Sequence, residues 1–195
     1  MYKFCILAAG RGTRNKTIEG LHKALLPIEN KAIISRIIEN VPRSVEIVIP
    51  VGYKSEQVKS YVNHVFPNRK IQFVDVDNYD GEGSGPGYSL LQCEKYLQCP
   101  FLFTSVDTLI DEKELIDLPE YNWVGVSNVD VESSSSYCLV KGDRVVESFY
   151  YGSGVQAFIG MSGILDYDVF WDSLKSNSNL NNEHQVLDGF SKLDE

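Results

Sequence analysis

Residues 7–14 read Leu-Ala-Ala-Gly-Arg-Gly-Thr-Arg and directly follow the apolar run Phe4-Cys5-Ile6-Leu7, which is typical of a buried strand. The small residues and the two glycines let the backbone turn tightly and approach a ligand closely. Exposed N–H groups in such a turn form a concavity that binds anions. Arg11 and Arg14 add two permanent positive charges, and the planar guanidinium group suits phosphate oxygens. The segment therefore predicts a strand that ends at a polyphosphate site.

Charge is distributed unevenly along the 195 residues. The net charge is -9, which argues against nucleic acid as a partner. Residues 11–36, in contrast, contain six Lys or Arg and only two acidic side chains. A short basic segment in an acidic protein favours a local anion site over a long polyanion track. The hydrophobic fraction of 43% is enough for one domain with a sizeable core.

Cysteines and apolar runs indicate the compartment. The four cysteines show no metal-ligand spacing, so we expect free thiols in a reducing environment. The first apolar run is too short for a signal peptide, and no run reaches the roughly 18 residues of a spanning helix. We therefore expect a soluble, cytoplasmic protein without a membrane partner.

Strands and helices alternate in the first half of the sequence. Strands are predicted at 2–7, 45–51, 71–76 and 101–106, and helices at 32–41, 55–65 (capped by Ser55) and 89–97. This alternation indicates an α/β fold with a Rossmann-like, mostly parallel sheet flanked by helices. Ligands of such sheets lie beyond the carboxyl ends of the strands. The glycine loop and Asp107 both follow strands at that edge.

The second half is predicted to be a small β-rich portion. Strands are expected at 123–127, 137–141, 145–149 and 157–164, with a two-residue turn at Gly142-Asp143. Helices are expected at 167–174 and 183–193. No linker or repeat divides the chain, so we expect a single domain over residues 1–195.

The two commonest nucleotide loops do not fit residues 7–14. A P-loop requires a Lys-Ser or Lys-Thr pair after its second glycine, and none follows Gly12. A dinucleotide-binding loop requires a third glycine at the position of Asn15.

A third pattern fits. Residues 7–14, followed by His22-Lys23-Ala24-Leu25-Leu26-Pro27-Ile28, resemble the signature of the nucleotidylyltransferases that activate sugar phosphates. That family reads L-A-A-G-x-G-T-R and then P-K-x-L-L-P-[IV]. The resemblance implies that Arg14 holds the triphosphate and that Lys23 lies between the nucleotide α-phosphate and the incoming phosphate. It also implies a nucleotide-binding role for Leu7, Ala8, Ala9, Gly10, Arg11, Gly12 and Thr13. His22 stands where the family usually has proline, which we expect to loosen the loop while the lysine charge is kept.

Two later segments extend the resemblance. Gly85-Pro86-Gly87 resembles the family's G-T-A turn, whose backbone reads the base, although Pro86 removes an N–H and a hydroxyl and leaves the base open. Residues 101–108 resemble the strand that ends in G-D-T, which implies that Asp107 binds Mg²⁺ together with phosphate oxygens. The alternative is that Asp107 caps a helix, and the acidic residues at 111, 112, 114 and 117 are expected to be solvated.

The acceptor side matches less well. The resemblance implies that Glu147 contacts an acceptor hydroxyl and that Gly163 lies in the strand lining the acceptor pocket. The family's E-K-P lysine is missing, because residues 147–149 read Glu-Ser-Phe. A second metal-binding aspartate is also missing, and Asp188 is the nearest candidate. The chain is therefore expected to be truncated or part of a longer protein.

These motifs lead to one main hypothesis and two alternatives. The main hypothesis is transfer of NMP from an NTP to a phosphorylated acceptor, in the first place a sugar 1-phosphate, with release of pyrophosphate. Arg14, Lys23 and Asp107 would be the catalytic residues and Mg²⁺ the cofactor. The alternatives are a cytidylyltransferase acting on a phosphocholine-like or other small phosphorylated compound, and a non-catalytic nucleotide-binding regulatory domain.

Overall fold

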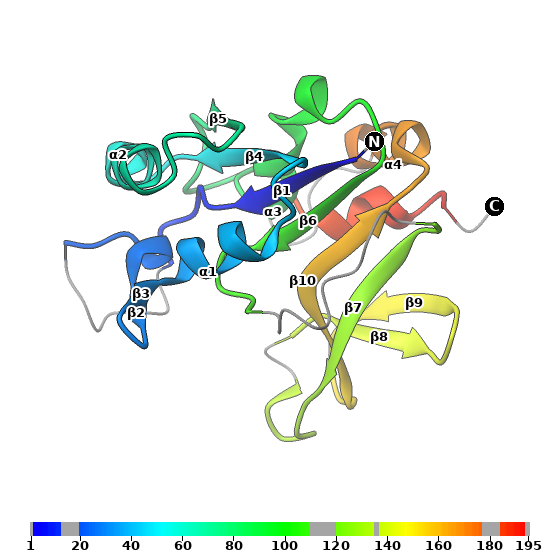
Figure 1. The fold of residues 1–195 in the computed structure, drawn as a ribbon. Helices are drawn as coiled ribbons and strands as arrows, with labels where there is room; N and C mark the ends of the chain where they lie inside the picture. Colours follow the sequence, from blue (N-terminus) through cyan, green and yellow to red (C-terminus); the bar gives the residue numbers. More distant parts are fainter. Residues whose placement is uncertain (1, 13–19, 110–119, 135–136, 177–183, 194–195) are drawn as a thin grey trace.

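A computed structural model describes residues 2–12, 20–109, 120–134, 137–176 and 184–193 (Figure 1). Within these ranges the strands form an eight-stranded sheet in the order β5-β4-β1-β6-β10-β8-β9, with β7 paired to β10 off this path. A separate two-stranded hairpin pairs β2 with β3. In Figure 1, β5 with α2 and the hairpin β8–β9 lie at opposite ends of the sheet.

The first half of the chain forms the parallel part of the sheet. Its strands are β1 (Lys3–Leu7), β4 (Glu46–Val51), β5 (Ile71–Asp75) and β6 (Phe101–Ser105). The helices between them are α1 (Ile33–Asn40), α2 (Ser55–Val65) and the short α3 (Pro86–Leu91). Three small elements complete this half: the 3-10 helix η1 (Lys23–Leu25), β2 (Pro27–Ile28) and β3 (Lys31–Ala32). A 3-10 turn, η2 (Glu94–Tyr96), follows α3.

The second half adds antiparallel strands to the same sheet. The long strand β10 (Gln156–Ile164) runs antiparallel to β6 and pairs with both β7 (Trp123–Asn128) and β8 (Leu139–Gly142). β9 (Val146–Tyr150) completes the hairpin with β8. The chain then forms α4 (Tyr167–Ser176) and the 3-10 helix η5 (Val186–Phe190). The predicted α/β class with a parallel core and a β-rich portion is confirmed, and that portion is continuous with the core sheet.

Apolar side chains cover both faces of the parallel part of the sheet. Strands that are buried on both sides are apolar along their whole length. Phe4, Ile6 and Ile47 belong to the core beneath α1 and α2. The opposite face packs on α3, α4 and η5, where the Phe101 ring stacks on Trp171 with the ring centroids 5.2 Å apart. The parallel strands therefore have both faces covered, and their carboxyl ends are left to form a site.

Four local predictions were wrong. The helix expected at 89–97 begins earlier, because Gly85 has a φ of 135° and Pro86 is pre-shaped for the first helical turn, and it gives way to η2. The helix expected at 183–193 is shorter, since it is the 3-10 helix η5 (Val186–Phe190). Gly142 pairs with Val146, so the hairpin loop has three residues and not two. Ser55 is the first residue of α2, whose cap is the left-handed Lys54 without a side-chain hydrogen bond.

Two further expectations concern the chemistry of the chain. All four cysteines are free thiols, as expected. Among the described helices, none has both the length and the apolar character needed to cross a bilayer.

Candidate active site

The carboxyl ends of β1 and β6 lie side by side. Leu7 pairs with Ser105 in the parallel ladder, and the Val106 N–H donates to the Leu7 carbonyl at 3.2 Å. The glycine loop leaves β1 at this point, and Asp107 follows β6 two residues after Ser105. The topology therefore brings the loop and the carboxylate to the same edge of the sheet, as predicted for residues that follow parallel strands.

Lys23 reaches this edge from η1. Its ammonium lies 3.1 Å from the Asp107 Oδ2 atom, and 61% of the Asp107 side chain is exposed. Gly12 lies under the lysine stem, since a Cβ on Gly12 would be 3.0 Å from the Lys23 Cδ atom. Gly12 also has a φ of 66°, a conformation that favours glycine. The structure thus brings together three of the predicted site residues: Gly12, Lys23 and Asp107.

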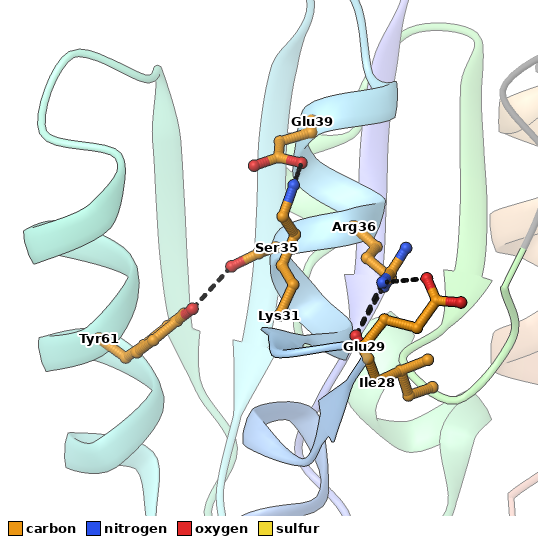
Figure 2. Close-up of polar contacts among 7 residues, drawn as sticks. All are labelled: Ile28, Glu29, Lys31, Ser35, Arg36, Glu39 and Tyr61. Carbon is orange, nitrogen blue, oxygen red and sulfur yellow. Dashed lines mark hydrogen bonds and ion pairs between the residues drawn. The ribbon is translucent and has the colours of Figure 1, made fainter.

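The hairpin that follows η1 is fixed to α1. Its turn places Glu29 and Asn30 at φ values of 49° and 64°, as a tight two-residue hairpin turn requires. Arg36 donates to the Ile28 carbonyl at 2.7 Å and pairs with Glu29 at 2.9 Å (Figure 2). This contact holds the hairpin, and with it the element that carries Lys23, against α1.

Two further contacts in Figure 2 strengthen this support. Lys31 on β3 pairs with Glu39 at 2.6 Å, one helical turn beyond Arg36. The hydroxyl groups of Ser35 and Tyr61 are 2.9 Å apart and join α1 to α2. The Lys23 element is therefore anchored to a pair of helices that are themselves bonded to each other.

His22 holds the chain just before Lys23. Its side chain is fully buried, and its Nδ1 atom accepts the Ala24 N–H at 3.1 Å. Its own N–H donates to Gln57 Oε1 at 3.0 Å, and Gln57 Nε2 donates to the Gly20 carbonyl at 2.9 Å. These hydrogen bonds restrain the loop at the position where the family usually has proline, and the expectation that histidine loosens it stays a prediction.

The surroundings of His22 keep its ring uncharged. Burial is the main cause that lowers its pKa to about 4, and the neighbouring positive charge of Lys23 acts in the same direction. The carbonyl groups of Gly10 and Ala8 act in the opposite direction but do not outweigh burial. The basic character of the site at neutral pH therefore comes from lysine and arginine.

Arg11 is turned toward the loop that precedes α3. Its Nη1 atom lies 2.6 Å from Asp80 Oδ2, and both side chains are about half exposed. The guanidinium group also lies over the Tyr53 ring, 5.3 Å from the centroid, and Lys54 approaches the same ring. In this state Arg11 joins the glycine loop to residues 77–83, and its predicted contact with a nucleotide stays a prediction. Thr13 and Arg14 lie outside the described residues, as do the acidic positions between 110 and 119.

The turn at Gly85-Pro86-Gly87 packs against the C-terminal segment. The Gly87 N–H donates to the His184 carbonyl at 2.8 Å. A Cβ on Gly85 would lie 2.6 Å from the His184 oxygen, and one on Gly87 would lie 2.6 Å from the Gln185 oxygen. Close backbone packing thus explains both glycines, and base recognition by this turn stays a prediction.

Asp188 has a structural role in the same segment. Its carboxylate accepts the Gln185 N–H at 3.3 Å and closes a capping box on η5, while burial raises its pKa. Within the described residues, no group of three or more His, Cys, Asp or Glu side chains could hold a metal ion. Metal binding by Asp107 stays a prediction.

The two predicted acceptor residues lie in the β-rich half. Glu147 forms an ion pair with Lys141 on the neighbouring strand at 2.8 Å, a partner that the sequence analysis missed. Gly163 is covered by the Trp123 indole, which a Cβ at that position would overlap. Their acceptor roles stay predictions.

A cavity of about 390 Å³ lies in this half as well. Trp123, Val124, Phe149 and Phe190 are among its lining residues, and neither Lys23 nor Asp107 lines it. The cavity is therefore separate from the edge where the phosphates are expected.

A parallel sheet whose first strand leads into a glycine loop, with a lysine and an aspartate meeting beside it, is the arrangement of a nucleotidyltransferase. A family model for the MobA-like NTP transferase domain matches residues 4–118. The chain belongs to this family, and the resemblance to sugar-phosphate nucleotidylyltransferases is confirmed.

Individual relatives agree with this assignment. The chain is 30% identical over 139 residues to the bifunctional protein GlmU of Methanococcus aeolicus, covering 69% of this chain but only 32% of that protein. It is 28% identical over 165 residues to the D-glycero-alpha-D-manno-heptose 1-phosphate guanylyltransferase of Campylobacter jejuni, covering 75% of this chain and 73% of the relative. The crystal structure of a UDP-glucose pyrophosphorylase with UDP-glucose shares the fold, with a TM-score of 0.78 at 21% identity over 97% of this chain and 86% of the other.

Proposed function

We propose that this protein transfers a nucleoside monophosphate from an NTP to a small phosphorylated acceptor. An acceptor phosphate oxygen attacks the α-phosphorus in line, and the bond from the α-phosphorus to the bridging oxygen breaks. Pyrophosphate leaves with that electron pair. The observation that carries the proposal is the contact between Lys23 and Asp107 beside the glycine loop.

The site supports this reaction by positioning and by neutralising charge. Lys23 would neutralise oxygens on the α-phosphate and on the incoming phosphate, and Arg14 would hold the triphosphate. The backbone of residues 7–13 would cradle the phosphates through N–H groups. No covalent intermediate on the protein is needed.

The exposed Asp107 carboxylate fits a magnesium ion, which takes oxygen ligands and commonly binds one or two carboxylates plus phosphate oxygens. The ion would supply further charge neutralisation on the phosphates. In the absence of substrate, Lys23 balances the Asp107 charge, so the two groups are held close together at the place where phosphates and cation would enter.

A sugar 1-phosphate is the acceptor that we propose first. The Campylobacter relative is named as a heptose 1-phosphate guanylyltransferase, and it aligns over most of its length. The second candidate is a phosphocholine-like acceptor, because the lysine of the family's E-K-P segment is missing. Lys141 lies next to Glu147 on the neighbouring strand, and we propose that Lys141 binds the acceptor phosphate.

A pyrophosphate-release assay tests the proposal. The four NTPs are each combined with a set of sugar 1-phosphates and with phosphocholine, with wild type, Lys23→Ala and Lys175→Ala. Lys175 on α4 is a matched control because, like Lys23, it is a lysine paired with a carboxylate, here that of Glu94 at 2.5 Å. We expect pyrophosphate with one base and one acceptor class, unchanged in Lys175→Ala and strongly reduced in Lys23→Ala. Tight NTP binding without pyrophosphate from any pair would support the regulatory-domain alternative.

A further inference from the structure

The histidine before Lys23 is a fully buried polar residue that the proposed chemistry does not use. Its backbone has φ -69° and ψ 141°, a conformation that proline also adopts. The backbone shape of the loop therefore does not require histidine at this position. What histidine adds is a set of hydrogen bonds, one from its N–H to Gln57 and one to its ring from Ala24.

The ring hydrogen bond fixes the tautomer. Because Nδ1 accepts the Ala24 N–H, the neutral imidazole carries its proton on Nε2. The Nε2 atom is buried and forms no hydrogen bond of standard geometry with a described residue. The hydrogen bonds of His22 therefore tie it to η1 through Ala24 and to α2 through Gln57.

Tyr53 connects the His22 ring to the glycine loop. The centroids of the His22 and Tyr53 rings lie 6.3 Å apart, and the Tyr53 N–H donates to the Ala9 carbonyl at 2.9 Å. The ring is therefore packed beside the residue that holds the loop backbone.

We propose that His22 is a positioning residue: its ring nitrogen and its backbone N–H hold η1 in place, so that the Lys23 ammonium faces the phosphate groups of the substrates. This proposal rests on the proposed function. His22 itself touches no reacting atom and acts through Lys23. The charged groups that face the ring are Lys23 and Lys54, both positive, and they favour the neutral form.

Three substitutions separate the contributions of the ring. In His22→Asn, the amide oxygen lies where Nδ1 lay and retains the acceptor for Ala24. In His22→Gln, the amide reaches the Nε2 position but the acceptor is lost. His22→Pro keeps the backbone angles and loses both the N–H and the acceptor. His64→Asn is the matched control, because His64 is exposed on α2.

The first measurement is steady-state kinetics beside thermal unfolding. We expect kcat to fall about ten-fold in His22→Gln and His22→Pro, the effect of one misplaced hydrogen-bonding group, with little change in KM for the NTP. His22→Asn should retain most of the wild-type kcat. A wild-type kcat in the glutamine and proline variants, or an equal loss in the asparagine variant, would overturn the proposal.

Two further measurements do not depend on catalysis, and the first of them uses only the wild-type protein. Nitrogen-15 NMR of the wild-type ring should show the neutral form with its proton on Nε2, and a ring protonated on Nδ1 at neutral pH would refute the assignment. Amine-reactive labelling followed by mass spectrometry should modify Lys23 about three-fold faster in His22→Gln than in wild type, with Lys175 unchanged in both. Equal labelling of Lys23 would contradict the positioning role. If the wild-type protein releases no pyrophosphate while both of these results hold, the proposed function fails and the role of His22 in placing Lys23 stands.

Discussion

The Lys23 ammonium and the Asp107 carboxylate lie 3.1 Å apart although 84 residues separate them in the sequence. Lys23 comes from a short 3-10 helix anchored to α1, and Asp107 comes from the end of β6 in the centre of the sheet. An exposed ion pair contributes little to stability, with a median near 0–1 kcal/mol. The fold therefore gains little stability from this contact, and the proposed phosphate site accounts for both groups lying at this edge of the sheet.

Replacing Lys23 with alanine should lower turnover by about 100-fold or more, the size seen when one transition-state donor is removed. Thermal stability should change little, because the Asp107 side chain is 61% exposed and water screens the ion pair. Pyrophosphate release and differential scanning fluorimetry measure the two quantities, with Lys175→Ala as the control. Near-normal turnover in Lys23→Ala would count heavily against the assignment of the site.

Replacing Asp107 with asparagine should raise the magnesium concentration needed for half-maximal activity. The amide keeps the shape of the side chain but supplies a neutral oxygen, which is a weaker ligand for a hard cation. The measurement is a magnesium titration at saturating NTP in wild type and in Asp107→Asn. Asp188→Asn is a useful comparison, since Asp188 caps η5 and should affect stability and not the titration. Unchanged metal titration in Asp107→Asn would remove Asp107 from the site.

The sequence sufficed to predict that the glycine loop and Asp107 lie at the same edge of the sheet. The glycine loop follows an apolar strand, and Asp107 follows another strand whose carboxyl end must lie at the same edge of a parallel sheet. Lys23 was predicted only through the family resemblance, because nothing in its local sequence shows that η1 turns back toward β6.

What the sequence did not predict depends on contacts between distant segments. The His184 carbonyl binds the Gly87 amide across almost 100 residues, and Trp123 covers Gly163 from a neighbouring strand. A glycine required by close packing and a glycine required by a ligand look alike in a sequence. The burial of His22 was missed for the same reason, since its partner Gln57 lies on a different element.

Two glycine substitutions should therefore change different properties, one the affinity for NTP and the other the stability of the fold. A Cβ on Gly10 would meet no atom within 4 Å, so Gly10→Ala should fold normally and weaken NTP binding by filling the phosphate cradle. A Cβ on Gly87 would collide with the backbone at Gln185, so Gly87→Ala should destabilise the fold by about 1–3 kcal/mol. Calorimetric NTP titration and urea unfolding of both variants test this contrast. Normal NTP affinity in a folded Gly10→Ala variant would be evidence that the loop does not hold the nucleotide.

The pair of Arg11 and Asp80 gives a prediction about affinity. Asp80 holds the Arg11 guanidinium at 2.6 Å and so competes with an incoming triphosphate for it. Asp80→Asn should release Arg11 and tighten NTP binding by about two- to five-fold, whereas Arg11→Ala should weaken it. Titration calorimetry at low ionic strength measures both, and added salt should reduce the difference. If both substitutions weaken binding equally, the pair is part of the bound state and does not compete with the ligand.

The pH dependence of stability provides a test of the buried histidine. His22 has a pKa of about 4 in the folded protein against an ordinary value of 6.5, because burial disfavours the charged ring. Below about pH 6.5 the unfolded chain binds a proton that the folded chain does not accept until about pH 4, so stability falls as the pH is lowered through this window.

The two pKa values of His22 differ by roughly 2.5 units, which corresponds to about 3 kcal/mol of lost stability at the acid end of the window. His22→Asn has no titrating group at this position. As the pH is lowered through this window, it should therefore lose less stability than wild type, by about that amount. Urea unfolding at about pH 7 and about pH 4.5 measures the difference, and His64→Asn should follow wild type. Parallel losses in wild type and His22→Asn would mean that the folded protein protonates His22 as readily as the unfolded chain does, so that burial does not keep the ring neutral below about pH 6.5.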